Sequence, residues 1–277
     1  MKKYLQLIRI KHWIKNILIF IPMICGKVIN TNFIYLTILG FIAFSFGTSF
    51  IYIINDLKDI EKDKLHERKK QRPLASGKIK KKNAIIIAII SLILSLTINY
   101  IATKSFFNIT TYLLLSYIIS NILYTYYFKN IVIIDVAFLS LGFILRTYYG
   151  ASLINIEVSD WLFLTIMSGS LFLGLGKRKK ELINNINIRH SLKNYNELFL
   201  DKFQYTTLTL TILFYSLWSM EQVIVYTIPI IILIFMRYCL IIETNNEGDP
   251  TTVFYSDKLL IVLCLIYTII MTFILVI

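Results

Sequence analysis

Long runs of apolar residues, separated by short polar segments, dominate the pattern along the chain. Each run is about 20 residues long, which is the length that a helix needs to cross the hydrocarbon core of a bilayer. Nine such spans are expected, at residues 12–30, 33–54, 83–103, 106–128, 131–152, 160–176, 204–221, 223–242 and 258–276. The pattern therefore predicts an all-α, polytopic membrane protein with about nine transmembrane helices in a single membrane-embedded domain, residues 1–277.

The composition favours the same class. Hydrophobic residues make up 57% of the 277 positions, and the mean hydropathy is +0.68. The short alternating segments of a β-barrel are absent from the sequence. Bases interrupt the apolar residues of the first 15 positions, so no cleavable signal peptide is expected there. A short basic helix that lies at the membrane interface is expected instead.

The net charge of +13 has the sign that nucleic-acid binding requires, but its distribution indicates membrane topology instead. The N-terminal segment carries five Lys and Arg residues, residues 55–82 carry eleven, and residues 176–203 carry seven. The loops expected on the opposite side carry only Lys104. The positive-inside rule then places the N-terminus and both basic loops in the cytoplasm and the C-terminus outside a bacterial-type plasma membrane, with no nucleic-acid partner.

An acidic pattern, Asn-Asp-x-x-Asp-x-x-x-Asp, follows the second span at residues 55–63. If the helix continues, Asn55, Asp59 and Asp63 share one face and Asp56 flanks it. Mg²⁺ prefers oxygen ligands and typically takes one or two protein groups plus phosphate oxygens, so Asn55 and Asp59 are the expected metal ligands. The bases suited to further phosphate oxygens are Arg68, Lys69, Lys70 and Arg72. The residues alone leave open a solvated, mixed-charge loop that only sets topology.

This acidic pattern, followed by Arg-Pro-Leu-x-x-Gly at residues 72–77, resembles the first motif of the UbiA prenyltransferase superfamily. The resemblance extends from about Arg9 to Leu260. It implies a UbiA-like bundle of nine transmembrane helices whose first motif binds Mg²⁺ and a diphosphate. Members that prenylate aromatic acceptors carry a second acidic cluster in the later cytoplasmic loop.

The second basic loop departs from that pattern. Residues 174–182 read Gly-Leu-Gly-Lys-Arg-Lys-Lys-Glu-Leu, with four consecutive bases and one acid, which makes a poor metal site and a good anion site. Together with Trp-Ile-Lys-Asn at residues 13–16 and Tyr-Ile-Ile-Asn-Asp at residues 52–56, this segment resembles the polyprenyl-phosphate phosphoribosyltransferase branch. A topology anchor at a helix end is the alternative for the bases.

Charged residues also lie inside the fifth span. Asp135 and Arg146 are eleven residues apart and return to nearly the same helix face, so they are expected to line one cavity at different depths. Pairing with another helix is the structural alternative. At the cytoplasmic end of the fourth span, Lys129, with Asn121 and Tyr124 before it, is expected either to reach a phosphate or to snorkel to the interface.

The resemblance implies Mg²⁺-dependent transfer of 5-phosphoribosyl from phosphoribosyl diphosphate (PRPP) to a polyprenyl phosphate, with release of diphosphate. The expected catalytic residues are Asp56, Asp59, Asp63 and Asp135. The expected substrate-binding residues are Lys15, Tyr52, Lys69, Arg72, Asn121, Tyr124, Lys129, Arg146, Lys177, Arg178 and Glu181. No role follows for Asp249 or for Asp257, although Asp257 lies at a recurrent position of the branch.

Two alternatives stay open. A UbiA-type prenyltransferase with an atypical second motif would move an isoprenoid chain from its diphosphate to an aromatic or other acceptor. A transporter or lipid-binding scaffold is a different class, which is less favoured because the sequence shows no Gly- or Pro-interrupted spans at matching positions of two halves. The sequence allows a homo-oligomer but predicts neither the oligomeric state nor the lipid chain length.

Overall fold

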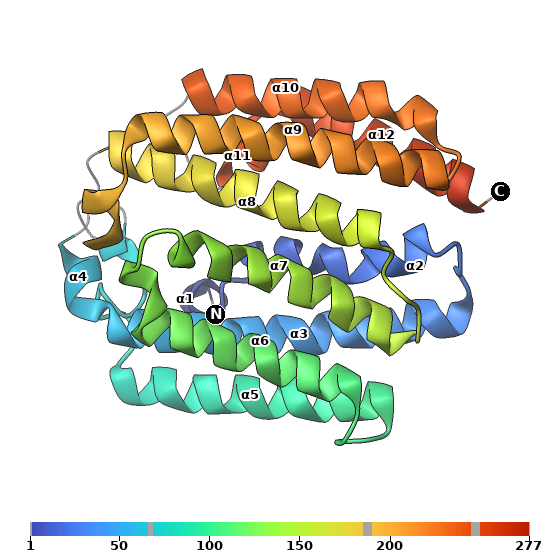
Figure 1. Ribbon diagram of the computed structural model, residues 1–277. Helices are drawn as coiled ribbons and strands as arrows, with labels where there is room; N and C mark the ends of the chain where they lie inside the picture. Colours follow the sequence, from blue (N-terminus) through green and yellow to red (C-terminus); the bar gives the residue numbers. More distant parts are fainter. Residues whose placement is uncertain (1, 66–68, 185–189, 245–249, 277) are drawn as a thin grey trace. The chain divides into compact units, whose positions relative to one another are not determined.

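Helices account for every element in the computed structural model, which describes residues 2–65, 69–184, 190–244 and 250–276 (Figure 1). Each of the nine expected spans overlaps a helical segment. In chain order these are η1 with α2 (Ile10–Phe20 and Ile21–Cys25), α3 (Thr31–Lys58), α5 (Lys81–Thr103), α6 (Ile109–Tyr126), α7 (Ile134–Leu153), α8 (Asp160–Ile183), α9 (Glu197–Glu221), α10 (Ile228–Thr244) and α12 (Lys258–Val276). The shorter elements are α1 (Lys2–Leu7), α4 (Ile60–Lys64), η2 (Lys69–Gln71), η3 (Phe128–Asn130), η4 (His190–Asn194), η5 (Val225–Thr227) and α11 (Pro250–Ser256).

Four segments in the described part of the chain are long and apolar enough to cross a membrane: α3, α5, α7 and Val225–Thr244, while Lys258–Ile274 is apolar but shorter. The all-helical fold is thus confirmed, whereas nine crossings and the orientation of the termini stay predictions. The expected end of the first span was wrong. Because α2 ends at Cys25, Lys27 lies in the connection to α3 and not inside the first span.

Packing contacts divide the chain into two compact units. Unit 1 consists of Met1–Met23, Ile29–Tyr127 and Leu145–Ile156, and unit 2 of Ile24–Val28, Phe128–Ile144 and Glu157–Ile277. Helix α7 therefore contributes its first half to unit 2 and its second half to unit 1. The expected single transferase domain stays a prediction.

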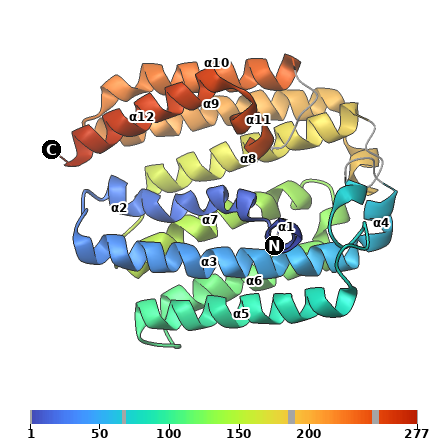
Figure 2. The same cartoon turned by 180° about the vertical axis from the view of Figure 1, so that it is seen from behind.

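In unit 1, α3 runs along α5 and also packs against η1 and α6 (Figure 2). Phe44, Leu114, Tyr117 and Tyr149 form part of its buried core. Close approach of helices needs small residues at the contact. At Gly150, an added Cβ would lie 2.1 Å from the carbonyl oxygen of Ile19, so α7 and η1 touch there backbone to backbone.

Gly150→Ala is expected to destabilise unit 1, because the new methyl group meets backbone that cannot rotate away. The expected cost is about 1–3 kcal/mol, the usual range for overpacking a core, and thermal unfolding in detergent measures it. Gly169→Ala is the matched control, since its Cβ would meet only the side chain of Thr211, with the methyl group at 3.3 Å and the hydroxyl oxygen at 3.8 Å. Equal shifts in the two melting temperatures would contradict the prediction.

In unit 2, α8 packs along α9, and α10 contacts both α9 and α12 (Figure 1). A second buried cluster, which includes Val136, Leu192, Tyr195 and Leu200, packs the segment between α8 and α9 against the start of α7. Helix α8 continues to Ile183, well past the expected end of its span at residue 176. The four consecutive bases therefore lie on a helix and not in a loop.

Candidate functional site

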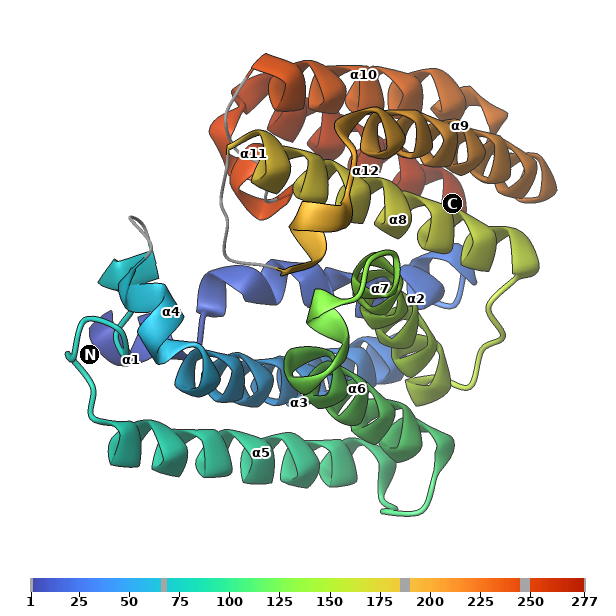
Figure 3. The ribbon, with the colours of Figure 1, turned by 60° about the vertical axis from the view of Figure 1, so that its left-hand side comes forward.

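The acidic pattern lies where α3 ends and α4 begins, next to α1 (Figure 3). Asp59 separates the two helices, but the backbone N–H of Asp59 still donates to the Asn55 carbonyl at 3.0 Å, and that of Asp63 to the Asp59 carbonyl at 2.8 Å. Helical spacing is therefore maintained through the break. Asp63 nevertheless lies on a second helix, α4, and its carboxylate shares Arg72 with Asp56, so the expected common face of Asn55, Asp59 and Asp63 stays a prediction.

Two of these acids form ion pairs with arginines. The Asp56 carboxylate accepts hydrogen bonds from Arg9 and, at 3.1 Å, from Arg72, whose Nη1 also donates to Asp63 at 2.7 Å. Asp56 and Asp63 are buried, with 2% and 4% of their surface exposed, whereas Asn55 and Asp59 are half-buried. The four acidic-motif residues therefore divide into an arginine-paired set and a more accessible Asn55–Asp59 set.

Arg9 was not expected to be a site residue. Its backbone is left-handed, at φ 53°, which is uncommon for a residue with a side chain and costs energy. Its guanidinium centre lies 4.7 Å from the Tyr52 ring centroid, a cation–π contact. The only sequence signal was its place among the N-terminal bases, since its acidic partner lies 47 positions away.

A magnesium ion at this position would have few ligands from the protein. Among the residues the structure describes, no three His, Cys, Asp or Glu side chains come together as a metal-binding group. Asn55 and Asp59 nevertheless supply an amide and a carboxylate oxygen one turn apart, and both are half-buried. This donor set fits an ion that takes one or two protein oxygens and completes its shell with phosphate and water.

Arg146 forms a buried network inside unit 1. Its Nε donates to Asn16 Oδ1 at 2.8 Å and its Nη2 to the Tyr117 hydroxyl at 2.7 Å. Asn16 in turn donates to Ser45 at 2.9 Å. The guanidinium centre also lies 4.8 Å from the Tyr117 ring centroid, so the charge is held by amide, hydroxyl and aromatic groups.

Asp135 belongs to a different network, in unit 2. Its Oδ2 accepts from Arg178 Nε at 2.6 Å, and Arg178 Nη1 donates to Glu181 at 2.7 Å. The side chains of Asp135 and Arg178 are both 0% exposed. Asp135 and Arg146 each take part in a hydrogen-bond network of their own unit, and the expectation that they line one cavity stays a prediction.

The four consecutive bases on α8 have different surroundings. Arg178 is paired as above, and Lys179 donates to Asp201 and Glu243, both at 2.7 Å. Burial would lower the pKa of Lys179, but these hydrogen bonds outweigh that effect and raise the pKa to about 12. Lys180 is also buried, and Lys177 alone of the four is half-buried. The run is therefore not a uniform phosphate-binding surface.

Tyr195, in the segment between α8 and α9, was missed by the sequence analysis. Its hydroxyl donates to Asp135 Oδ1 at 2.7 Å and accepts from the backbone N–H of Ile133 at 2.8 Å. Ser191 lies nearby, with its hydroxyl 3.3 Å from the Lys129 carbonyl oxygen. No local pattern marks Tyr195, because its partners are about 60 positions away in the chain.

The remaining expected substrate-binding residues lie in both units. In unit 1, Asn121 donates to the Tyr117 carbonyl at 2.9 Å. Lys129 is buried in unit 2, with 8% of its surface exposed. The half-buried members of the whole expected set are Lys15, Tyr52, Lys69, Arg72, Asn121, Tyr124, Lys177 and Glu181.

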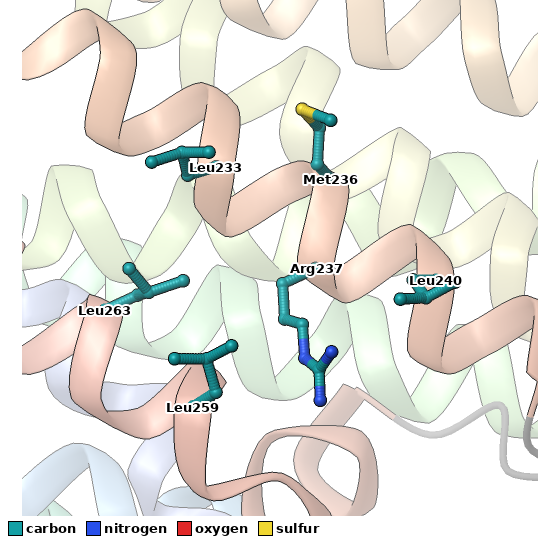
Figure 4. A pocket seen from close by; sticks show the side chains of 6 residues that line it. All are labelled: Leu233, Met236, Arg237, Leu240, Leu259 and Leu263. Atoms are coloured by element: carbon teal, nitrogen blue, oxygen red, sulfur yellow. The ribbon is translucent and has the colours of Figure 1, made fainter.

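Asp257 pairs with Arg237 beside a groove and caps a helix. A groove of about 480 Å³ lies between α10 and α12, lined by Leu233, Met236, Arg237, Leu240, Leu259 and Leu263 (Figure 4). Arg237 donates to both carboxylate oxygens of Asp257, at 2.6 and 3.2 Å, and Asp257 caps α12 through the Leu260 N–H. These bonds, with the arginine first, hold the pKa of Asp257 below its usual value. Arg68 and Asp249 lie outside the described residues.

Similarity to known proteins shows the family of this chain. The model of the UbiA prenyltransferase family matches residues 19–264. A decaprenyl-phosphate phosphoribosyltransferase of Corynebacterium glutamicum is 31% identical, over 94% of this chain and 83% of its own. One of Mycobacterium tuberculosis is 27% identical, over 93% and 89%.

The fold also matches a solved structure, a UbiA homolog from Archaeoglobus fulgidus bound to GPP and Mg²⁺. The TM-score is 0.75 at 20% identity, and 99% of each chain is covered. The chain therefore belongs to the UbiA prenyltransferase family, in the branch that contains the decaprenyl-phosphate phosphoribosyltransferases.

Proposed function

We propose that this protein is a membrane-bound, Mg²⁺-dependent transferase that moves 5-phosphoribosyl from PRPP to a polyprenyl phosphate and releases diphosphate. The names of the Corynebacterium and Mycobacterium relatives support the reaction class. The Mg²⁺ bound to the Archaeoglobus homolog supports the metal. The active site would face the cytoplasm, where the basic segments are expected.

The observation that carries the proposal is the unequal chemistry of the two motifs. The end of α3 offers an Asn55–Asp59 pair of oxygen donors, whereas the end of α8 offers Lys177 and an acid, Glu181, that is already held by Arg178 at 2.7 Å. A donor held by metal at both motifs would need accessible acids at both. One metal-type motif and one anion-type motif suit a diphosphate donor that carries a further phosphate.

Asn55 and Asp59 would hold the Mg²⁺ that binds the donor diphosphate. Bound Mg²⁺ would neutralise charge on the leaving group. Asp56 and Asp63 have a different role in this proposal, because both are buried and paired with arginines. They would hold the guanidinium groups of Arg9 and Arg72, and those groups would meet the remaining diphosphate oxygens.

The second motif would bind the remaining phosphate of the donor. Lys177 is the accessible base of its run and would contact that phosphate directly. Arg178 would act as a fixed charge beside it, since its side chain is enclosed and tied to Asp135 and Glu181. In unit 1, Lys15 and Lys69, which are half-buried, would contribute positive charge toward the diphosphate.

The transfer itself needs little acid–base chemistry from the protein. A phosphate oxygen of the acceptor forms a bond to the anomeric carbon of the ribose, and the bond from that carbon to the diphosphate oxygen breaks. The acceptor phosphate is already anionic, so no strong general base is required. The residues above would stabilise the leaving diphosphate and hold both substrates in reacting geometry.

Prenyl transfer is the second candidate, because the Archaeoglobus homolog was solved with GPP and Mg²⁺. Membranes that contain the protein should form a labelled lipid from ribose-labelled PRPP and decaprenyl phosphate, and EDTA should abolish its formation. Matched membranes without the protein are the control. Prenylation of an aromatic acceptor from GPP, with no label transferred from PRPP, would reverse the ranking.

A further inference from the structure

We propose that Tyr195 is a positioning residue of the donor-phosphate site, which it supports through Asp135 and Arg178. This inference rests on the proposed function, because it assigns Tyr195 to the binding of PRPP. Tyr195 is 7% exposed and lies among Val136, Leu192 and Leu200, so it acts through its neighbours and not by touching the substrate.

The Tyr195 hydroxyl joins a strained turn to a buried charge. It accepts from the N–H of Ile133 at 2.8 Å and donates to Asp135 Oδ1 at 2.7 Å. Ile133 has φ 69°, which is a genuine outlier for a β-branched residue and persists only where the surroundings hold it. Burial first, and then the bond to Asp135, raise the pKa of Tyr195, so the hydroxyl stays protonated and continues to donate.

Asp135 transmits this contact to the basic run. Its other carboxylate oxygen accepts from Arg178 Nε at 2.6 Å, so the tyrosine and the arginine each hold one side of the same carboxylate. Buried networks of this kind fix orientation when every member is satisfied. Loss of the hydroxyl would free one side of Asp135, loosen Arg178, and shift the end of α8 that carries Lys177.

Tyr195→Phe tests the inference, because it keeps the packed ring and removes only the hydroxyl. The KM for PRPP should rise about tenfold, the equivalent of one hydrogen bond to a charged group. The KM for decaprenyl phosphate and kcat should each stay within about twofold, because a positioning residue of the donor site affects neither acceptor binding nor the leaving-group chemistry.

Tyr215→Phe is the matched control. Tyr215 is also buried in unit 2, and its hydroxyl bonds to Thr227 at 2.5 Å, at the opposite end of α9. It should lower thermal stability in detergent by a similar amount and leave the KM for PRPP unchanged. The same rise in KM for both variants would mean that Tyr195 has only a structural role, and would overturn the inference.

A double-mutant cycle with Lys177→Ala tests the route. If Tyr195 acts through the end of α8, the double variant should have a KM for PRPP within about twofold of Lys177→Ala alone. Additive effects would overturn the route. Failure of the unaltered protein to form a phosphoribosyl lipid would overturn the proposed function. Normal activity with an unchanged KM in Tyr195→Phe would overturn this inference alone.

Discussion

Asp59→Asn is expected to lower the rate of transfer by about 10³-fold, because the amide keeps an oxygen but loses the charge that binds Mg²⁺. Asp59 and Asn55 are half-buried on one helix face, while Asp56 and Asp63 are buried against arginines. The Mg²⁺ concentration required for residual activity should also rise. Initial rates across a Mg²⁺ titration measure both effects.

Glu61→Gln is the matched control for this variant. Glu61 lies in α4 within the same motif, and its side chain is 76% exposed and paired only with Lys64 in the described contacts. Glu61→Gln removes the same charge but leaves the proposed metal ligands unchanged. Its rate of transfer and its Mg²⁺ dependence should therefore match those of the unaltered protein. Full activity in Asp59→Asn, or equal losses in both variants, would exclude the proposed metal site.

Asp135→Ala is expected to lower the free energy of unfolding of unit 2 by about 3–5 kcal/mol, since it leaves a buried guanidinium without its main partner. The Arg178 side chain is 0% exposed, and Asp135 is held by both Arg178 and Tyr195. The double variant Asp135→Ala with Arg178→Met should recover much of the loss, because the fully buried guanidinium is gone and Glu181, which also loses Arg178, is 17% exposed. Thermal unfolding in detergent gives both values.

Asp201→Ala provides the comparison. Asp201 also pairs with a base of the α8 run, Lys179, at 2.7 Å, but its side chain is 42% exposed. Water screens such a pair, so the expected cost is at most about 1 kcal/mol. Equal destabilisation by Asp135→Ala and Asp201→Ala would contradict the view that the Asp135–Arg178 pair is a buried structural charge pair.

Most of the helical architecture was predictable from the sequence. An apolar run long enough to cross a bilayer has few alternatives to a helix. Each expected span overlaps a helical segment, from η1 to α12. The ends were less predictable. Helix α8 continues to Ile183, because lysine, arginine, glutamate and leucine are good helix formers and nothing between residues 177 and 182 stops the helix.

That extension changes the interpretation of the basic run. Consecutive residues on a helix point about 100° apart, so four adjacent bases cannot all face one phosphate. In the structure, Arg178 and Lys179 bond to different acids, on different helices, and Lys177 is the accessible one. The different surroundings of the four bases could have been predicted from the sequence if the run had been placed on a helix.

The hydrogen-bond partners of the charged residues could not be predicted from the sequence. Arg9 bonds to Asp56 and Tyr195 to Asp135 across separations of 47 and 60 positions. A single sequence gives the chemistry of each side chain but not which distant one it meets, because helix packing decides that. The acidic motif was therefore found from its spacing, while the arginines and the tyrosine that organise the two motifs were not.

The most direct test of the central claim is the mass of the lipid product. Purified protein would be incubated with PRPP, decaprenyl phosphate and Mg²⁺, with Asp59→Asn as the inactive control. The account predicts a lipid heavier than decaprenyl phosphate by one phosphoribosyl group, formed in equal amount to the diphosphate released. Unchanged decaprenyl phosphate in a preparation that transfers a prenyl chain from GPP would contradict it.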